Sequence, residues 1–288
     1  ISEEILKRLV EAYRRIRNTS RFILGNLYDF NPATDTVPYG EMAELDRWIL
    51  HRLQEVVRRV REAYEQYQFH VVYTTLYNFC TVDLSALYLD VMKDRLYTSK
   101  AASPARRSAQ TAMTEILEAM VRLLAPILTF TAEEVWLALP HYPGKAESVH
   151  LTQFPEVNGQ YLQADLAERW KTLITVKGEV AKAIETARQN KVVGHSLDAA
   201  VVIAAPENLR AILETHREDL RTLLIVSDVR IAGEPLSGEA YRSTEIPSLA
   251  VSVSRAKGEK CNRCWIYSET VGSSVEHPTI CARCRDNL

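Results

Sequence analysis

The sequence lacks a long apolar run and a strong charge of either sign. No apolar stretch approaches the roughly 20 residues that cross a bilayer, so we expect no membrane partner. The formal net charge is −2 over 288 residues, so any polyanion would have to bind local basic patches. Hydrophobic residues make up 47% and charged residues 25% of the chain, which is ordinary for a soluble protein with a full core.

The usual marks of an active site and of secretion are also absent. There is no Gly-rich phosphate loop, no pair of carboxylates in an apolar context and no nucleophile–base pair that the spacing supports. We therefore predict no catalytic residue. No signal peptide is present, and cysteines are scarce outside one cluster, which is typical of the cytoplasm. The chain begins at Ile1 without methionine, and we interpret it as a piece of a longer polypeptide.

Four of the five cysteines lie in about the last thirty residues, in a pattern typical of zinc sites. They form two C-x-x-C pairs separated by about sixteen residues, so each pair can turn through a tight knuckle and aim two sulfurs at one point. Four thiolates fill a tetrahedral shell and leave no position open for chemistry, so we predict one structural Zn²⁺. The predicted ligands are Cys261, Cys264, Cys281 and Cys284.

Two other chemistries compete for these cysteines. Redox-active dithiols would each need a thioredoxin-like βαβ context, which neither pair has. Two disulfides would suit an exported protein, but they would conflict with the missing signal peptide and leave Cys80 unpaired. A metal assay separates zinc from the redox alternative, which predicts a thiol of low pKa and no bound metal.

Hydrophobic periodicity predicts that the first half is an antiparallel helix bundle. The opening helix carries an apolar stripe that includes Ile5 and Leu9, with Ser2 as its expected N-cap. The last helix of the bundle is expected to begin with a capping box formed by Thr131 and Glu134. The expected helices cover about 2–28, 45–67, 71–97, 104–126 and 131–139.

The pattern changes after a connector that contains proline and glycine. A long helix at 162–189 is followed by strands at 199–205, 223–231 and 249–253, with a helix at 206–220. This alternation predicts a small α/β unit with one helix over two or three strands. The fold class is therefore mainly α. We predict a helical bundle over 1–156, a long helix plus a small α/β subdomain over 157–254, and a zinc-ribbon tail with four cysteine ligands over 255–288.

Basic residues gather on polar helix faces. Arg14, Arg17 and Arg21 lie on one side of the opening helix with Asn18 beside them, so this row could track a phosphate backbone and read a base edge. A solvated outer face would show the same pattern. Trp265 either packs over the zinc knuckle or stacks on an unpaired base. The remaining candidates for RNA contacts are Lys93, Arg95, Arg106, Arg107 and Arg263.

Several segments resemble the isoleucyl-tRNA synthetases, in order and over essentially the whole chain. The opening Arg-Asn-Thr helix is similar in valyl- and leucyl-tRNA synthetases too, whereas the four-cysteine module is typical of the bacterial isoleucyl form. The segments are 13–22, 45–48, 69–70, 79–84, 88–97, 124–128, 185–191, 194–197 and 256–265, together with the second cysteine pair.

The resemblance implies a part of a class I ligase that uses ATP to charge tRNA-Ile with isoleucine and that edits its product. The HIGH and KMSKS signatures and the editing insertion are missing, so this fragment alone is expected to be inactive in aminoacylation. It would bind the anticodon stem-loop, beside the catalytic domain of the same polypeptide, as a monomer. The competing hypothesis is a stand-alone interaction module, which predicts an exposed apolar patch and weak, sequence-blind RNA binding.

Overall fold

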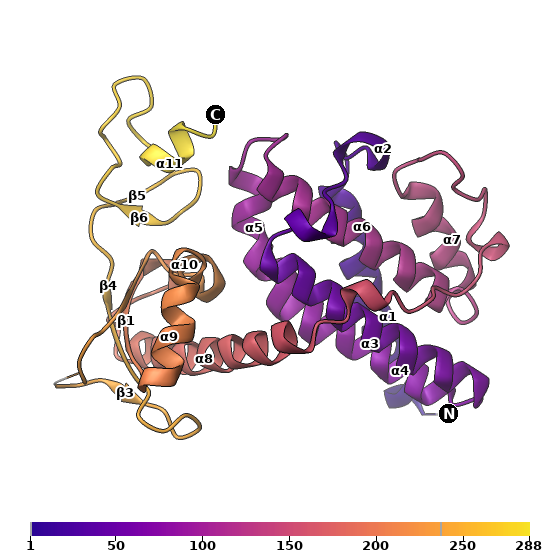
Figure 1. The fold of residues 1–288 in the computed structure, drawn as a ribbon, viewed down its shortest axis with the longest axis horizontal. Helices are drawn as coiled ribbons and strands as arrows, with labels where there is room; N and C mark the ends of the chain where they lie inside the picture. The colour runs from indigo at the N-terminus through magenta and orange to yellow at the C-terminus, as the bar shows by residue number, and fades with distance from the viewer. Residues whose placement is uncertain (1, 237) are drawn as a thin grey trace. The chain divides into compact units, whose positions relative to one another are not determined.

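A computed structural model describes residues 2–236 and 238–288, and the chain forms two compact units (Figure 1). The first unit ends at Ala164, and the second runs from Asp165 to Leu288. The cysteine-rich tail, which the sequence separated as a third part, lies in the second unit. Within the described residues, no helix is both long enough and apolar enough to span a membrane.

The first unit is a helix bundle, which confirms the predicted fold class. In it α3 packs against both α4 and α6, and α1 contacts α6 and α7. Its helices are α1 (Glu3–Asn26), α2 (Pro32–Asp35), η1 (Tyr39–Glu41), α3 (Glu44–Glu65), α4 (Phe69–Asn78), η2 (Phe79–Tyr88), α5 (Leu89–Thr98), α6 (Pro104–Leu124), α7 (Thr129–Ala138), η3 (Val149–Leu151) and η4 (Gly159–Tyr161).

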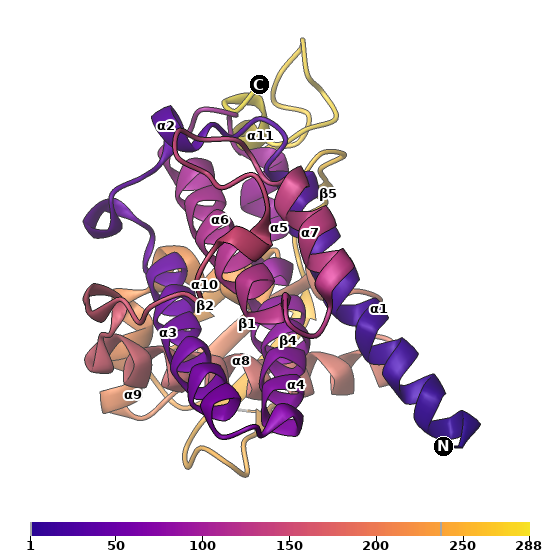
Figure 2. The same cartoon turned by 90° about the vertical axis from the view of Figure 1, so that its right-hand side faces the viewer.

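Helix α1 begins where the sequence predicted but buries less of its apolar stripe. The hydroxyl of Ser2 accepts a hydrogen bond from the backbone N–H of Ile5 at 3.4 Å, so the predicted N-cap is confirmed. Ile16 and Ile23 are buried, whereas Ile5 is 53% and Leu9 50% exposed. Figure 2 shows α1 running beside α7 and extending past it towards its N-terminus. No described residue covers the first turns, so the stripe is buried only from Ala12 onwards.

The predicted continuous helix at 71–97 is three helical segments in the structure. Between α4 and α5 lies η2, a π-helical stretch of ten residues. π-Helical turns close hydrogen bonds over one more residue than α-helical turns, and they are rare. This stretch buries Phe79, Leu84 and Tyr88. A periodicity of 3.6 residues cannot reveal such a change of pitch.

The predicted capping box of the last bundle helix is wrong. Helix α7 begins at Thr129, ahead of Thr131, and its N-cap residue Leu128 makes no side-chain capping bond. An acidic residue next to the predicted one has another role: the carboxylate of Glu133 accepts hydrogen bonds from the Ser148 hydroxyl and the Val149 N–H, both at 2.9 Å. This carboxylate fastens the loop after α7 back onto the helix.

The second unit combines the long helix α8 with a four-stranded sheet of strand order β2-β1-β4-β3. β1 runs parallel to β2 and antiparallel to β4. The predicted strand at 223–231 is shorter than expected, because Leu223 and Leu224 close α10 and Ile225 ends that helix in a left-handed conformation with φ +56°. The elements are α8 (Ala164–Gln189), η5 (Ser196–Asp198), β1 (Ala199–Ala204), α9 (Glu207–Thr215), α10 (Arg217–Leu224), β2 (Asp228–Ile231), β3 (Tyr241–Arg242) and β4 (Ala250–Arg255).

A buried carboxylate ties α8 to the edge of the sheet. Glu179 is fully buried and accepts a hydrogen bond from the Tyr241 hydroxyl of β3 at 3.0 Å. Lys182, one helical turn further on, pairs with the same carboxylate at 2.5 Å. A buried charge is tolerated when it is paired and hydrogen-bonded in this way. The short strand β3 is therefore held by α8 as well as by β4.

Candidate metal centre and nucleic-acid interface

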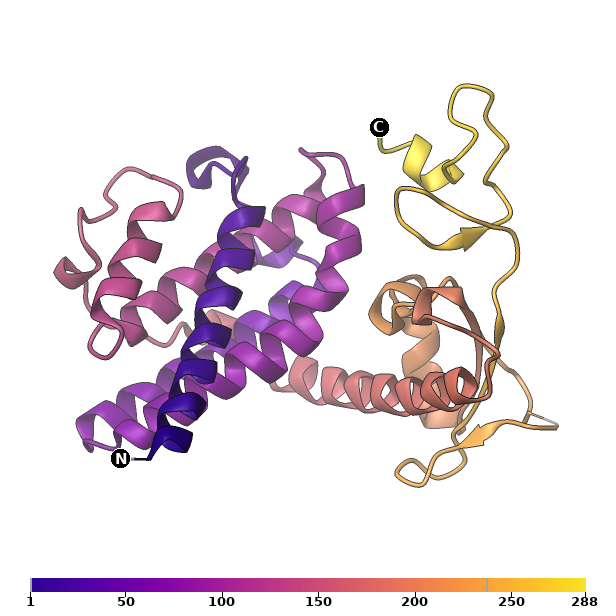
Figure 3. The same ribbon diagram turned by 180° about the vertical axis from the view of Figure 1, so that it is seen from behind.

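The cysteine-rich tail is a small hairpin followed by one helical turn, drawn in yellow in Figure 3. The strands β5 (Glu259–Lys260) and β6 (Tyr267–Ser268) pair antiparallel, and the first cysteine pair lies in the turn between them. The second pair lies at the start of α11 (Ala282–Arg285). Gly258 allows the hairpin to close, because its φ is +83° and a Cβ there would overlap the backbone of Ser268.

The four sulfurs have the geometry of one tetrahedral zinc site. All four Sγ atoms lie within 4.8 Å of one another, and those of Cys264 and Cys281 are 3.7 Å apart. A tetrahedron with Zn–S bonds of about 2.3 Å places its sulfurs about 3.8 Å apart. Cys264 is half-buried and the other three cysteines are buried. These residues fit a closed, structural zinc site, as the sequence predicted.

Backbone groups of both knuckles favour the thiolate form of Cys261, whereas burial raises the pKa of the Cys264 and Cys284 thiols. The Cys281 N–H donates to the Cys261 sulfur at 3.3 Å. Burial raises the pKa of the Cys261 thiol, but backbone hydrogen bonds from Cys264, Cys281 and Arg263 outweigh it and lower the pKa to about 6. A thiol with this pKa is largely ionised at neutral pH and ready to bind a metal.

The two predicted RNA contacts of the tail differ in their surroundings. The Arg263 guanidinium donates to the carbonyl oxygens of Cys284 at 2.7 Å and Asn287 at 3.1 Å, so it fastens the second knuckle to the first. Trp265 is 61% exposed. The Lys260 Nζ lies 6.0 Å from the centre of the Trp265 ring. Much of the indole is therefore exposed to solvent, with a cation over its ring.

The arginine row of α1 is displayed on the surface. Arg14, Arg17, Asn18 and Arg21 are all exposed. Arg14 pairs with Glu11, one helical turn earlier. Within the described part of the chain, Arg17 and Arg21 make no ion pair. Two guanidinium groups on one helix face are thus left to interact with an anion.

The structure brings Asn18 of α1 together with Lys93 of α5, which the sequence could not place. Both line a hollow of about 290 Å³ between α1 and the η2–α5 segment. Arg15 and Phe22 line it too, and sequence reasoning had not singled out Arg15. Lys93 bonds the Asp90 carboxylate at 2.7 Å but keeps 53% of its side chain exposed. An amide and two cations therefore border one hollow of the bundle.

Arg95, by contrast, is engaged inside the bundle. Its guanidinium donates to the Asp46 carboxylate at 2.7 Å, and Asp46 is fully buried. The hydroxyls of Tyr88 and Ser108 donate to the same carboxylate, at 2.8 and 2.5 Å. This arrangement holds α3, α5 and α6 together.

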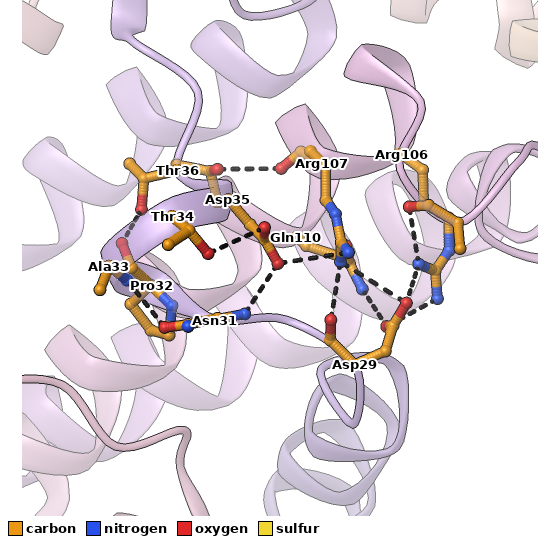
Figure 4. A network of polar contacts seen from close by, with 12 residues as sticks. Asp29, Asn31, Pro32, Ala33, Thr34, Asp35, Thr36, Arg106, Arg107 and Gln110 are labelled. Carbon is orange, nitrogen blue, oxygen red and sulfur yellow. Dashed lines mark hydrogen bonds and ion pairs between the residues drawn. The ribbon is translucent and has the colours of Figure 1, made fainter.

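Arg106 and Arg107 of α6 are engaged as well, in the network that Figure 4 shows around Asp29. Arg106 is 5% exposed and donates to both carboxylate oxygens of Asp29, at 2.5 and 3.0 Å. Arg107 bonds the Asp29 carbonyl at 2.9 Å and pairs with Asp35 at 3.2 Å. Burial raises the pKa of Asp29, but hydrogen bonds from Arg106 and Gln110 and the charges of both arginines hold it below its ordinary value.

Arg106 and Arg107 connect α6 to the loop after α1, whereas Arg95 connects α5 to α3. RNA contact by Arg95, Arg106 and Arg107 stays a prediction, and their internal partners give it no support. The sequence showed them only as basic points on helices, because partners 49 to 78 residues away are invisible to local patterns.

Comparison with known protein families adds two matches. Residues 46–203, more than half of the chain, match a family model described as "Anticodon-binding domain of tRNA ligase". Residues 258–287 match one described as "Zinc finger found in FPG and IleRS". The second match contains all four cysteines. The first begins at Asp46 and does not include α1.

Curated relatives named isoleucine–tRNA ligase align with almost the whole chain. The protein of Moorella thermoacetica is 49% identical over 285 residues, which are 98% of this chain and 31% of that protein. The protein of Geobacter sulfurreducens is also 49% identical, over 99% of this chain and 30% of its own length. A Thermoanaerobacter protein is 46% identical over 291 residues, which cover 100% of this chain and 31% of that protein. The chain thus spans about a third of the length of these relatives.

Proposed function

Because this chain belongs to the anticodon-binding domain family of tRNA ligases, we propose that it binds the anticodon stem-loop of tRNA-Ile for an isoleucine–tRNA ligase. The observation that carries this proposal is the family match over more than half of the chain. The zinc finger match and the 49% identity to isoleucine–tRNA ligases support isoleucine as the amino acid that the ligase uses.

The proposed role is positioning, not chemistry. The class I, ATP-dependent charging reaction and its editing would belong to the two thirds of the longer protein that this chain does not match. The only candidate metal site among the described residues is the cysteine cluster, whose four thiolates fill the shell of a structural zinc. This chain alone is therefore expected to be inactive in aminoacylation.

Two surfaces would contact the RNA. Arg17 and Arg21 would neutralise phosphates along α1, and the hollow beside Asn18 and Lys93 would accept a base edge. In the second unit the exposed indole of Trp265 offers a stacking surface, held by the zinc knuckle. Phosphate contacts fix the position of an RNA, whereas base contacts distinguish one RNA from another.

Filter binding of the zinc-loaded chain to tRNA-Ile and to a non-cognate tRNA, across a salt series, tests this function. We expect a cognate preference that survives moderate salt. The variant Arg17→Gln/Arg21→Gln should weaken binding to both RNAs and lower the salt slope by about two, since each phosphate contact contributes about one. Asn18→Ala should instead reduce the cognate preference.

The matched control is Lys7→Gln/Arg8→Gln, which removes the same charge from the same helix at residues that pair with Glu3 and Glu4. It should leave binding unchanged. Equal, steeply salt-sensitive binding to both tRNAs by the unaltered chain would contradict anticodon recognition.

An exposed apolar face also favours a protein partner. Ile5, Leu6, Leu9 and Val10 on the first turns of α1 are each at least 50% exposed. We assign this face to the catalytic part of the same longer polypeptide, because the relatives extend far beyond the matched region. The proposal includes a monomeric, cytoplasmic protein. A sedimentation mass near 32.7 kDa for this chain would support the monomer.

A further inference from the structure

A hollow of about 570 Å³ lies where α8 ends, in the second unit. Three cations border it: Arg188 at the end of α8, Lys191 just after it and Arg255 at the end of β4. Val192 and Val193 give it an apolar side. The volume lies within the range of about 300–1,000 Å³ that is usual for ligand sites. The function proposed above uses none of these residues.

Lys191 has a backbone conformation that lysine disfavours. Its φ is +59°, and its N–H donates to the Arg188 carbonyl at 2.9 Å while the Val192 N–H donates to the Ala187 carbonyl at 2.9 Å. This hydrogen-bond pattern is the Schellman helix ending, which usually has glycine or asparagine at that position. A lysine there strains the backbone. Such strain fits a role for the side chain, because the turn itself has no need of an ammonium group.

The carboxylates around the hollow already have partners. Glu185 pairs with Arg188 at 2.8 Å. One oxygen of Asp198 accepts the backbone N–H groups of Gly194 at 3.1 Å and His195 at 2.8 Å. Glu185 is thus ion-paired, whereas Asp198 is hydrogen-bonded to backbone groups.

The other two cations are exposed and lack such partners. Among the described residues neither Lys191 nor Arg255 makes an ion pair, and the Arg255 guanidinium lies 5.9 Å from the Tyr267 ring centre. Two cations from different elements therefore border one hollow, and neither forms an ion pair with a described carboxylate. Such a pair attracts an anion.

We propose that this hollow binds one unpaired nucleotide of the RNA. Its phosphate lies between Lys191 and Arg255, and its base lies against Val192, which is 45% exposed. The plane of the Arg188 guanidinium offers a second stacking surface, as arginine does for splayed bases. An apolar side next to two cations suits a nucleotide better than a bare inorganic anion. The inference rests on the proposed function, because it assumes that the bound polymer is tRNA.

Substitution of Lys191 separates binding from folding. Lys191→Gly removes the ammonium group and relieves the left-handed strain, so the melting temperature should not fall, whereas affinity for tRNA-Ile should fall about fivefold and the salt slope by about one. Arg255→Gln should weaken binding similarly. The control is Lys171→Gln, a lysine on α8 about 27 Å from the end of that helix, with 75% of its side chain exposed. It should bind as the unaltered chain does.

Mononucleotide titration tests the hollow without the tRNA. Uridine 5′-monophosphate should bind the unaltered chain more tightly than uridine or inorganic phosphate, and Lys191→Gly should abolish the difference. Unchanged tRNA affinity in both Lys191→Gly and Arg255→Gln would overturn the nucleotide site and leave the proposed function intact. Equal affinity for uridine 5′-monophosphate and phosphate would also overturn it. If the unaltered chain binds uridine 5′-monophosphate but shows no preference for tRNA-Ile over the non-cognate tRNA, the proposed function is refuted and the nucleotide site is supported.

Discussion

Arg95 reaches across 49 residues of sequence to pair with the fully buried Asp46 at 2.7 Å. The carboxylate also receives the hydroxyls of Tyr88 and Ser108. A buried carboxylate stays charged only where donors replace its lost hydration. The pair thus helps to hold the bundle helices α3, α5 and α6 together, although the sequence had suggested Arg95 as an RNA contact.

Arg95→Gln should destabilise the chain by about 3 kcal/mol, because it leaves a buried charge without its cation. Urea unfolding measures the difference. Lys93→Gln, two residues away on the exposed side of α5, should change the free energy of unfolding by less than about 0.5 kcal/mol. Equal stability of the two variants would show that the carboxylate does not depend on Arg95.

The stability of the bundle should fall in acid through Asp29. Its pKa in the folded chain lies below the ordinary value of an aspartate, so its contribution to stability is complete above that ordinary pKa and is lost as the pH falls through the folded pKa. Asp29→Asn should therefore cost about 2 kcal/mol at pH 7 and progressively less below about pH 4.

The control for this titration is Asp90→Asn, which removes an exposed ion pair with Lys93. It should change the unfolding free energy little at any pH. Both variants keep the zinc site, so acid release of the metal affects them equally. If Asp29→Asn lowers the unfolding free energy equally at pH 3 and pH 7, the pKa of Asp29 is not lowered in the folded chain.

Zinc removal should unfold the tail and leave the bundle folded. Metal analysis should find one zinc per chain. Cys281→Ser should lose it, because zinc binding supplies the folding free energy of such small modules. Limited proteolysis should then cut within 255–288 and spare the first unit, whereas Cys80→Ser should retain the metal. Protection of the tail after complete chelation would refute a structural role for zinc.

Gly258→Ala should weaken zinc binding far more than Gly272→Ala. Both glycines have positive φ, +83° and +86°, but only a Cβ at Gly258 meets the backbone of the opposite strand. The strain alone costs about 1 kcal/mol, whereas displacing the strand should cost about 3 kcal/mol, or roughly 100-fold in zinc affinity. Competition with a chromogenic chelator measures the ratio of the zinc affinities of the two variants. A ratio near one would contradict the close approach of Gly258 to the Ser268 backbone.

Features that depend on neighbouring residues could be predicted from the sequence. Ser2 caps α1 because its hydroxyl reaches the N–H group of Ile5, three residues ahead. The zinc ligands followed from spacing, since two residues between sulfurs make a knuckle. The change to an α/β pattern after the bundle followed from the change of period.

Features that depend on residues far apart in the chain could not be predicted from the sequence. The internal roles of Arg95 and Arg106 require Asp46 and Asp29, which local patterns cannot place beside them. The hollow at the end of α8 needs Arg255 from β4, which lies 64 residues after Lys191 in the chain. The π-helical η2 depends on side-chain packing in three dimensions, not on a period.

One hydroxyl joins strand β6 of the zinc module to η5, the helical turn before β1. Ser227 donates to the Leu197 carbonyl at 2.5 Å and accepts the Tyr267 N–H of β6 at 2.7 Å. Leu197 precedes Asp198, whose carboxylate organises one side of the hollow beside Lys191. Amide hydrogens at 195–198 and at 267 should therefore exchange with solvent as one cooperative unit. A metal bound by four sulfurs would then slow the local opening of a nucleotide site that it does not contact.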